Sequence, residues 1–165
     1  MMPQLIKVGM ADLNIALYPD VLTTIGLGSC VGIALYDKIN KIGGLAHIML
    51  PSSKDIKNNS NKAKFADTAI VSLLTMMLEN KADKKNIVCK LAGGAQMFAL
   101  KNGSGNNDIL NIGVRNVAAV KKVLEELKIP IIAEDTGGNF GRTIELYTED
   151  GGLMVKTIGH GTKII

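Results

Sequence analysis

The chain has 165 residues and a formal net charge of +4, with 47% hydrophobic and 21% charged residues. This composition is typical of a globular protein, and the length predicts one domain over residues 1–165 that buries enough surface to fold without a disulfide or a metal. A nucleic-acid-binding protein is not expected, because the chain has two arginines, no tryptophan and 4% aromatic residues, and so lacks the basic stripe that such binding requires.

Cysteine content and apolar runs indicate the compartment. Cys30 and Cys89 could form at most one disulfide, and residues 1–9 lack the basic start and long apolar run of a secretory signal. No apolar run approaches the roughly 20 residues of a membrane-spanning helix. The sequence therefore predicts a protein of the reducing cytoplasm without membrane insertion.

The first half of the chain predicts short strands and one helix. Strands are expected at 5–8 and 21–25, and the stretch between them carries Asp12, Asn14 and a Pro19-Asp20 turn signal. Residues 31–36 and 44–50 flank a polar turn and predict a β-hairpin. Residues 51–64, rich in Ser, Asn and Lys, predict a loop that borders a site, and 67–78 has apolar residues at helical spacing.

The second half continues the same alternation of strands and helices. A strand is expected at 86–92, a flexible loop at 101–108, and a helix at 112–127 with Asn111 as its cap. Pro130 ends this helix, a strand follows at 131–134, and residues 143–147 and 153–158 predict a final hairpin. Two helices and about eight strands, mostly in hairpins, predict an α+β layered fold with antiparallel pairing.

A glycine-rich turn before Cys30 is the sharpest local feature of the sequence. The segment Thr-Thr-Ile-Gly-Leu-Gly-Ser-Cys ends at Cys30, and its thiol needs a base because only a few per cent of a free thiol ionises at neutral pH. His47 lies in the second strand of the predicted hairpin and could return beside Cys30. Thr24 could orient the imidazole, and backbone N–H groups around Gly28, Ser29 and Cys30 could stabilise an oxyanion.

The cysteines and histidines also have other interpretations. Cysteine is among the most buried residue types, so Cys30 could be a core residue, as Cys89 is expected to be. A zinc site needs about four ligands at short paired spacings, whereas Cys30, His47, Cys89 and His160 are scattered singly. No metal is expected, and His160 is expected to be an exposed tail residue.

Three further features remain open at this stage. The Gly26-x-Gly28 turn could cradle a phosphate, but it lacks the further glycine and the lysine of nucleotide-binding loops. Asn139 and Arg142 follow two glycines in a polar turn, where they are either solvated or anchor a substrate or partner. Phe98 could belong to the core or to the wall of a pocket.

Five segments together resemble the CheD family of chemoreceptor glutamine deamidases. They are TIGLGSC ending at Cys30, GGLAHIMLP ending at Pro51, AGGAQMF ending at Phe98, NIGVRN starting at Asn111 and EDTGGNFGR ending at Arg142. The resemblance spans nearly the whole chain. It implies the α/β/β sandwich shared with certain bacterial toxin deamidases, and it implies Cys30, His47 and Thr24 as catalytic residues.

The resemblance also implies an activity and partners. The expected reaction converts specific glutamines of chemotaxis receptors to glutamate through a thioester on Cys30, without a cofactor, and the same route would accept glutamyl methyl esters. A CheC-type phosphatase is implied as a partner that competes with the receptors. The alternative function is a regulatory binding module for that phosphatase with catalysis secondary. Intact Thr24, Cys30 and His47 favour the enzyme, while a purely structural domain would leave Cys30 resistant to alkylation.

Overall fold

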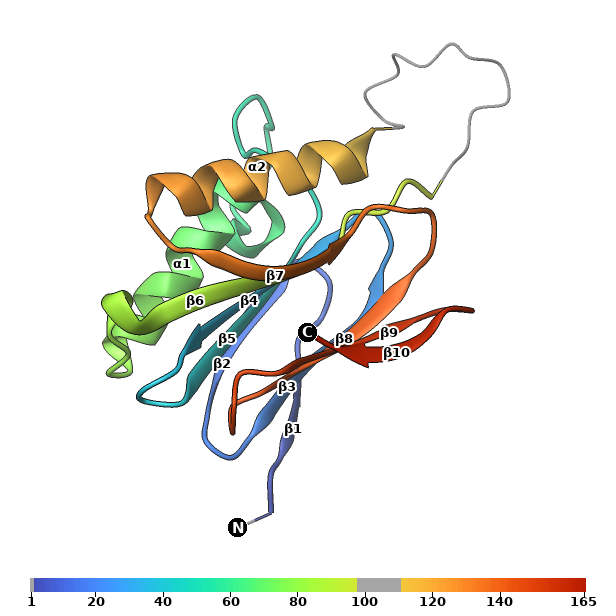
Figure 1. Ribbon diagram of the computed structural model, residues 1–165. Helices are drawn as coiled ribbons and strands as arrows, with labels where there is room; N and C mark the ends of the chain where they lie inside the picture. Colours follow the sequence, from blue (N-terminus) through green and yellow to red (C-terminus); the bar gives the residue numbers. More distant parts are fainter. Residues whose placement is uncertain (1, 98–110) are drawn as a thin grey trace.

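The computed structural model describes residues 2–97 and 111–165, in which two α-helices and ten strands form three layers (Figure 1). The central sheet has the spatial order β2 (Asp12–Leu17), β5 (Ile42–Ile48), β4 (Val31–Asp37), β6 (Ile87–Gly93) and β7 (Ile131–Thr136). The outer sheet has the order β1 (Leu5–Lys7), β3 (Val21–Leu27), β8 (Arg142–Tyr147), β9 (Leu153–Thr157) and β10 (Gly161–Ile164).

The helices cover one face of the central sheet, and the outer sheet covers the other (Figure 1). They are α1 (Ala66–Glu79) and α2 (Ile112–Glu126), and two short 3-10 turns lie at Lys62–Lys64 and Lys84–Asn86. Neighbouring strands are antiparallel except for the parallel pairs β1–β3 and β6–β7. The predicted α/β/β sandwich with mostly antiparallel strands and two main helices is confirmed.

Two hydrophobic cores lie on opposite faces of the central sheet. Along β4, Val31 and Ile33 belong to the core under the helices, whereas Ala34 belongs to the core between the sheets. This alternation follows from the period of two in a strand. Every residue of β4 and β5 is buried, because both faces of these central strands are covered. Cys89 lies in the helix-side core, as expected, and Cys30 lies in the core between the sheets.

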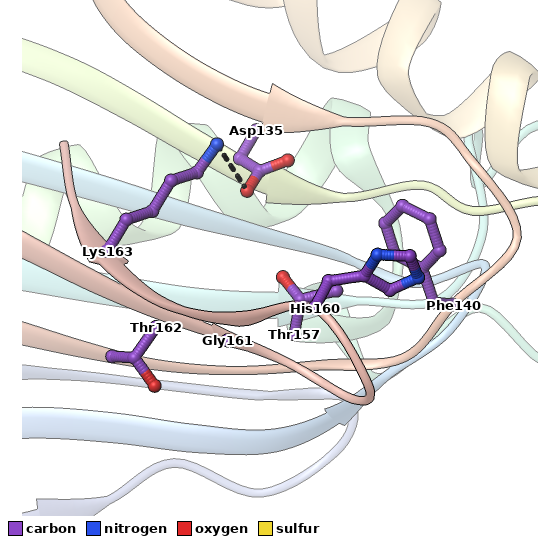
Figure 2. A pocket seen from close by; sticks show the side chains of 7 residues that line it. All are labelled: Asp135, Phe140, Thr157, His160, Gly161, Thr162 and Lys163. Atoms are coloured by element: carbon purple, nitrogen blue, oxygen red, sulfur yellow. Dashed lines mark ion pairs between the residues drawn. The ribbon is translucent and has the colours of Figure 1, made fainter.

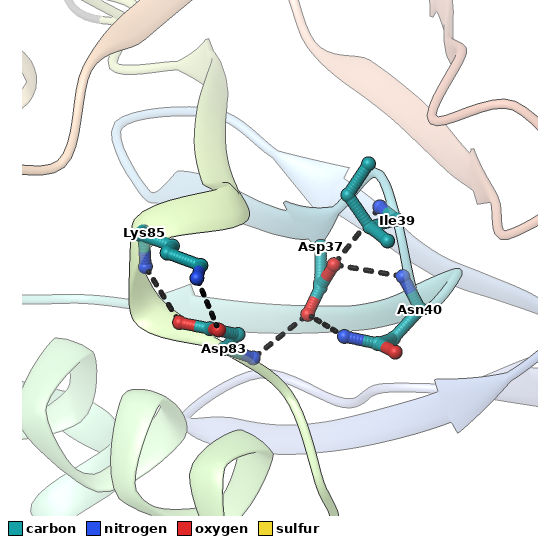
Figure 3. Close-up of polar contacts among 5 residues, drawn as sticks. All are labelled: Asp37, Ile39, Asn40, Asp83 and Lys85. Carbon is teal, nitrogen blue, oxygen red and sulfur yellow. Dashed lines mark hydrogen bonds and ion pairs between the residues drawn. The ribbon is translucent and has the colours of Figure 1, made fainter.

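Asp37 fixes the turn that joins β4 to β5 (Figure 3). Its carboxylate accepts hydrogen bonds from the backbone N–H groups of Ile39 (3.0 Å), Asn40 (2.9 Å) and Asp83 (2.8 Å), and from Asn40 Nδ2 (2.9 Å). Burial raises the pKa of Asp37, but these hydrogen bonds outweigh burial and the net pKa is lowered. This turn sets the register of the β4–β5 hairpin. The register decides which face of the sheet each side chain occupies.

Two edge strands were not predicted from the sequence. In β2, Asp12 and Asn14 were interpreted as part of a turn, but they are exposed residues of an edge strand whose alternate positions pack inward. Strand β10 pairs with β9 at the edge of the outer sheet, and His160 is exposed in the turn before it. Pairing with a neighbouring strand outweighs the weak β-propensity of Asp12 and Asn14 in β2 and of Gly161 and Lys163 in β10.

The predicted cap of α2 is wrong in one respect. Asn111 occupies the N-cap position, but its side chain makes no capping hydrogen bond.

Phe98 and the loop predicted at 101–108 lie outside the described residues. Among the helices of the described ranges, none is long and apolar enough to cross a membrane.

Candidate active site

Cys30 lies where the chain passes from the outer sheet to the central sheet. The pairing of β3 with β8 shifts register between Thr24 and Leu27, and Gly26 within this bulge has a φ of 75°. Glycine adopts such a positive φ without steric cost. The Gly28 N–H donates to Gly26 O at 3.1 Å, so this one of the predicted oxyanion donors already has an acceptor within the turn. The turn delivers Cys30, 8% exposed, to the start of β4 and into the layer between the sheets.

His47 faces the same layer as Cys30. It is fully buried on β5, directly opposite Gly32 of β4. Cys30 precedes Gly32 by two residues, so in an extended chain its side chain points to the same face. Diagonal neighbours on one face lie about 7–8 Å apart between their backbones, which long side chains can span. The hairpin predicted from the sequence therefore brings the imidazole to the side of the sheet that carries the thiol.

Thr24 reaches His47 from the outer sheet. Its Oγ1 lies 2.7 Å from His47 Nδ1, and both side chains are buried. The sheets approach closely here, since a Cβ added at Gly32 would lie 2.6 Å from Ile144 Cδ1. Ile144 of β8 is the cross-strand partner of Thr24. Because Gly32 has no side chain, Ile144 can pack against the central sheet opposite His47. This close packing places the Thr24 hydroxyl within hydrogen-bonding distance of the imidazole.

Burial keeps both His47 and Cys30 neutral at pH 7. It lowers the pKa of His47 from 6.5 to about 4. Burial also raises the pKa of Cys30, and the residue's own backbone N–H offsets part of this rise. His47 Nε2 is buried and has no hydrogen-bond partner within the described ranges. When Nδ1–H donates to Thr24, the lone pair of a neutral imidazole is at Nε2, and within the described ranges no hydrogen bond joins this nitrogen to the Cys30 thiol.

Three hydrogen bonds fix the backbone carbonyls of residues 28–30. Segment 94–95 donates its N–H groups to the carbonyls of Cys30 and Gly28, each at 2.8 Å, and Asn116 Nδ2 donates to the carbonyl of Ser29 at 3.0 Å. Within residues 2–97 and 111–165, the N–H groups of Ser29 and Cys30 donate to no backbone acceptor of another residue. In a trans peptide N–H and C=O point in opposite directions, so two free donors lie opposite these anchored carbonyls.

Arg142, a candidate for anchoring a substrate, is buried at 2% exposure. Its Nη2 lies 3.1 Å from Asp135 Oδ1, its Nη1 donates to Gly93 O at 3.4 Å, and its guanidinium lies 5.1 Å from the centre of the Phe140 ring. The charge is therefore paired within the fold and links β8 to β6 and β7. Asn139, by contrast, is exposed in the turn between β7 and β8.

Asp135 and Phe140, which contact Arg142, also line a pocket of about 170 Å³ (Figure 2). Its lining comprises Asp135, Phe140, Thr157, His160, Gly161, Thr162 and Lys163. Lys163 Nζ lies 3.2 Å from Asp135 Oδ2, and the Phe140 and His160 rings are 4.3 Å apart. None of Thr24, Cys30 and His47 lines this pocket. In the described part of the chain, no three His, Cys, Asp or Glu side chains gather into a metal site.

Asn116 is a site residue whose role the sequence reasoning missed. It is fully buried and contacts the carbonyls on either side of the candidate pair, at Ser29 and at Met49. The available signal was a polar residue on the face of a helix whose other periodic positions, such as Val120 and Leu124, are apolar. A buried polar side chain requires partners, and only the tertiary structure shows which ones it has.

Comparison with known proteins gives concordant results. Residues 49–157 match the family model described as CheD chemotactic sensory transduction. The chain is 62% identical over 98% of both chains to "Probable chemoreceptor glutamine deamidase CheD" of Caldanaerobacter subterraneus subsp. tengcongensis. It is 54% identical to the protein of the same name from Lachnoclostridium phytofermentans, and 50% identical to "Chemoreceptor glutamine deamidase CheD" of Halalkalibacterium halodurans, covering 99% of this chain and 100% of each relative.

Proposed function

The chain belongs to the CheD family, and on that premise we propose that it deamidates glutamine side chains of chemoreceptor cytoplasmic domains. The proposal assigns Cys30 as nucleophile, His47 as general base and Thr24 as the residue that orients the imidazole. It places the reaction in the cytoplasm and in one domain of residues 1–165, without a cofactor. The observation that carries it is the 2.7 Å contact between Thr24 Oγ1 and His47 Nδ1, on the same face as Cys30.

The first half of the proposed reaction forms a thioester. His47 Nε2 takes the proton of the Cys30 thiol as the sulfur attacks the carboxamide carbon of the receptor glutamine. The oxygen of the tetrahedral intermediate accepts hydrogen bonds from the free N–H groups of Ser29 and Cys30. His47 then gives its proton to the departing nitrogen, and ammonia leaves. At pH 7 the imidazole of His47 is neutral and the Cys30 thiol is still protonated, so the proposed reaction starts from these two neutral groups.

The second half hydrolyses the thioester. Water gives a proton to His47 Nε2 and attacks the acyl carbon, and the intermediate collapses by expelling the Cys30 sulfur, which regains its proton. The receptor is left with glutamate. A glutamyl methyl ester would enter the same route, because methanol leaves in place of ammonia at the step that His47 assists. We therefore include methylesterase activity in the proposal.

The receptor and a CheC-type phosphatase are the proposed partners. The names of the relatives support the receptor as substrate, and the resemblance of the sequence to the family supports the phosphatase. Asn139 is proposed to contact the receptor from its exposed turn. Because Arg142 is buried, its proposed contribution is to hold that turn through its contacts with Asp135 and Phe140.

A receptor cytoplasmic fragment incubated with the purified protein tests the function. Mass spectrometry of the fragment follows the mass gain at each glutamine that becomes glutamate. We expect conversion with the wild type and with Cys89→Ala, and none with Cys30→Ala. Cys89 is the matched control because it is a buried thiol on the opposite face of the same sheet. Equal conversion by wild type and Cys30→Ala would remove the proposed nucleophile.

A further inference from the structure

Asn116 projects from α2 into the end of the central sheet. Its Nδ2 donates to Ser29 O and to Met49 O, each at 3.0 Å. Both neighbours are carbonyl oxygens, which can only accept hydrogen bonds, so the NH₂ group and not Oδ1 must face them. Close packing brings the helix near enough, because a Cβ added at Gly113 would lie 2.4 Å from Ala95 O.

The two hydrogen bonds of Asn116 lie just beyond the last paired residues of the β4–β5 hairpin. The ladder between β4 and β5 ends at Val31 and Ile48, so strand pairing holds neither Ser29 nor Met49 to the other. Asn116 replaces the missing strand contact at this point. Its side chain spans the segment that precedes Cys30 and the segment that follows His47.

The bond to Ser29 O acts on the amide of Cys30. The Ser29 carbonyl and the Cys30 N–H belong to one planar peptide, in which they point in opposite directions. Fixing the carbonyl therefore fixes the direction of the N–H, and a hydrogen bond at one end of a peptide also polarises the other end. The bond to Met49 O prevents the Asn116 amide from rotating away.

We propose that Asn116 is a positioning residue that aims and polarises the Cys30 N–H as an oxyanion donor. The inference rests on the proposed function, because it assumes acyl chemistry at Cys30. Asn116 does not touch the substrate. It acts only through the peptide bond between Ser29 and Cys30, and therefore on the steps that develop a negative charge on oxygen.

The test compares Asn116→Leu, which has a similar size but no donor, with the wild type. Removing an oxyanion donor outright costs about 10²–10³ in kcat, so we expect misdirecting one to lower kcat for receptor deamidation by about 10- to 100-fold, with KM little changed. Alkylation of Cys30 by iodoacetamide should change little, because that displacement develops no oxyanion. Asn116→Ser has a hydroxyl that can donate to only one of the two carbonyls, so its kcat should lie between those of the wild type and Asn116→Leu. This variant also serves as the test if Asn116→Leu does not fold.

Val120→Ala is the matched control, since Val120 is a fully buried residue one turn further along α2. It should lower the unfolding temperature but leave kcat unchanged in assays well below that temperature. Unchanged kcat in folded Asn116 variants would overturn the inference, and so would equal losses in deamidation and alkylation. Hydrolysis of p-nitrophenyl acetate adds an independent readout. If the wild type cleaves this ester but leaves the receptor unchanged, the proposed function fails while the ester rates still test Asn116.

Discussion

Thr24→Val isolates the contact on which the proposed mechanism depends. Valine has nearly the shape of threonine, so the variant removes only the hydroxyl that lies 2.7 Å from His47 Nδ1. Leaving a buried polar group without its partner costs about 1–3 kcal/mol, and each 1.36 kcal/mol corresponds to tenfold in rate. If this cost falls on the orientation and tautomer of the base, kcat for deamidation should fall by about 5- to 150-fold.

Thr23→Val is the matched control for this experiment. Thr23 is the preceding residue of β3, is 5% exposed, and donates its Oγ1–H to Ile144 O at 2.8 Å. Each variant loses one buried hydrogen bond of a threonine, so both should lose a similar free energy of unfolding in urea. Only Thr24→Val should lose kcat, measured by mass spectrometry of the receptor fragment. Unchanged kcat in Thr24→Val, or equal losses in both variants, would refute the assignment of Thr24.

Two further predictions follow from the pKa values and burial of the site. The folded-state pKa of His47 is about 4, compared with an ordinary value of 6.5, so below pH 6.5 the unfolded chain binds a proton that the folded chain does not. The free energy of unfolding should therefore decline between pH 6.5 and pH 4 by up to about 3 kcal/mol. Urea titrations at several pH values should show a shallower decline for His47→Gln than for the wild type. An equal dependence of the unfolding free energy on pH in both proteins would contradict this. In iodoacetamide labelling followed by peptide mapping, native Cys30, which is 8% exposed, should react slowly because burial raises the pKa of its thiol, while fully buried Cys89 should stay protected until unfolding. Equal protection of both would favour a structural Cys30.

Local periodicity was sufficient to predict the elements that carry the nucleophile and the base. The hairpin was predicted at 31–36 and 44–50, and it is present as β4 (Val31–Asp37) and β5 (Ile42–Ile48). Because strand residues alternate between faces, the same pattern also predicted that His47 could return towards Cys30. Hairpins are local structures, so their register depends on residues near in sequence, and here the turn carries its own anchor at Asp37.

The elements that the sequence did not predict depend on partners distant in the chain. Strand β2 is stabilised by pairing with β5, some thirty residues later in sequence, where Asp12 lies opposite His47. Arg142 follows a polar turn, which suggested a surface residue, but Asp135 of β7 and the carbonyl of Gly93 accept its donors inside the fold. Asn116 ends one of the five segments that resemble the family and is a polar residue on an apolar helix face, but neither signal shows what its side chain contacts. Its two acceptors lie 87 and 67 residues away in the chain.

The site draws on all three layers of the sandwich, and this makes its geometry more sensitive than the fold itself. Thr24 comes from the outer sheet, Cys30 from the turn that leads into the central sheet, His47 from the central sheet, and Asn116 from the helix layer. The 2.7 Å hydrogen bond is lost when its two atoms move apart by about 0.9 Å, whereas a gap of about 0.5–1 Å costs a hydrophobic contact a quarter to a half of its dispersion energy. Small changes in the spacing of the layers should therefore reduce catalysis before they reduce stability. The absence of a side chain at Gly32, opposite His47, permits the close spacing that the contact requires.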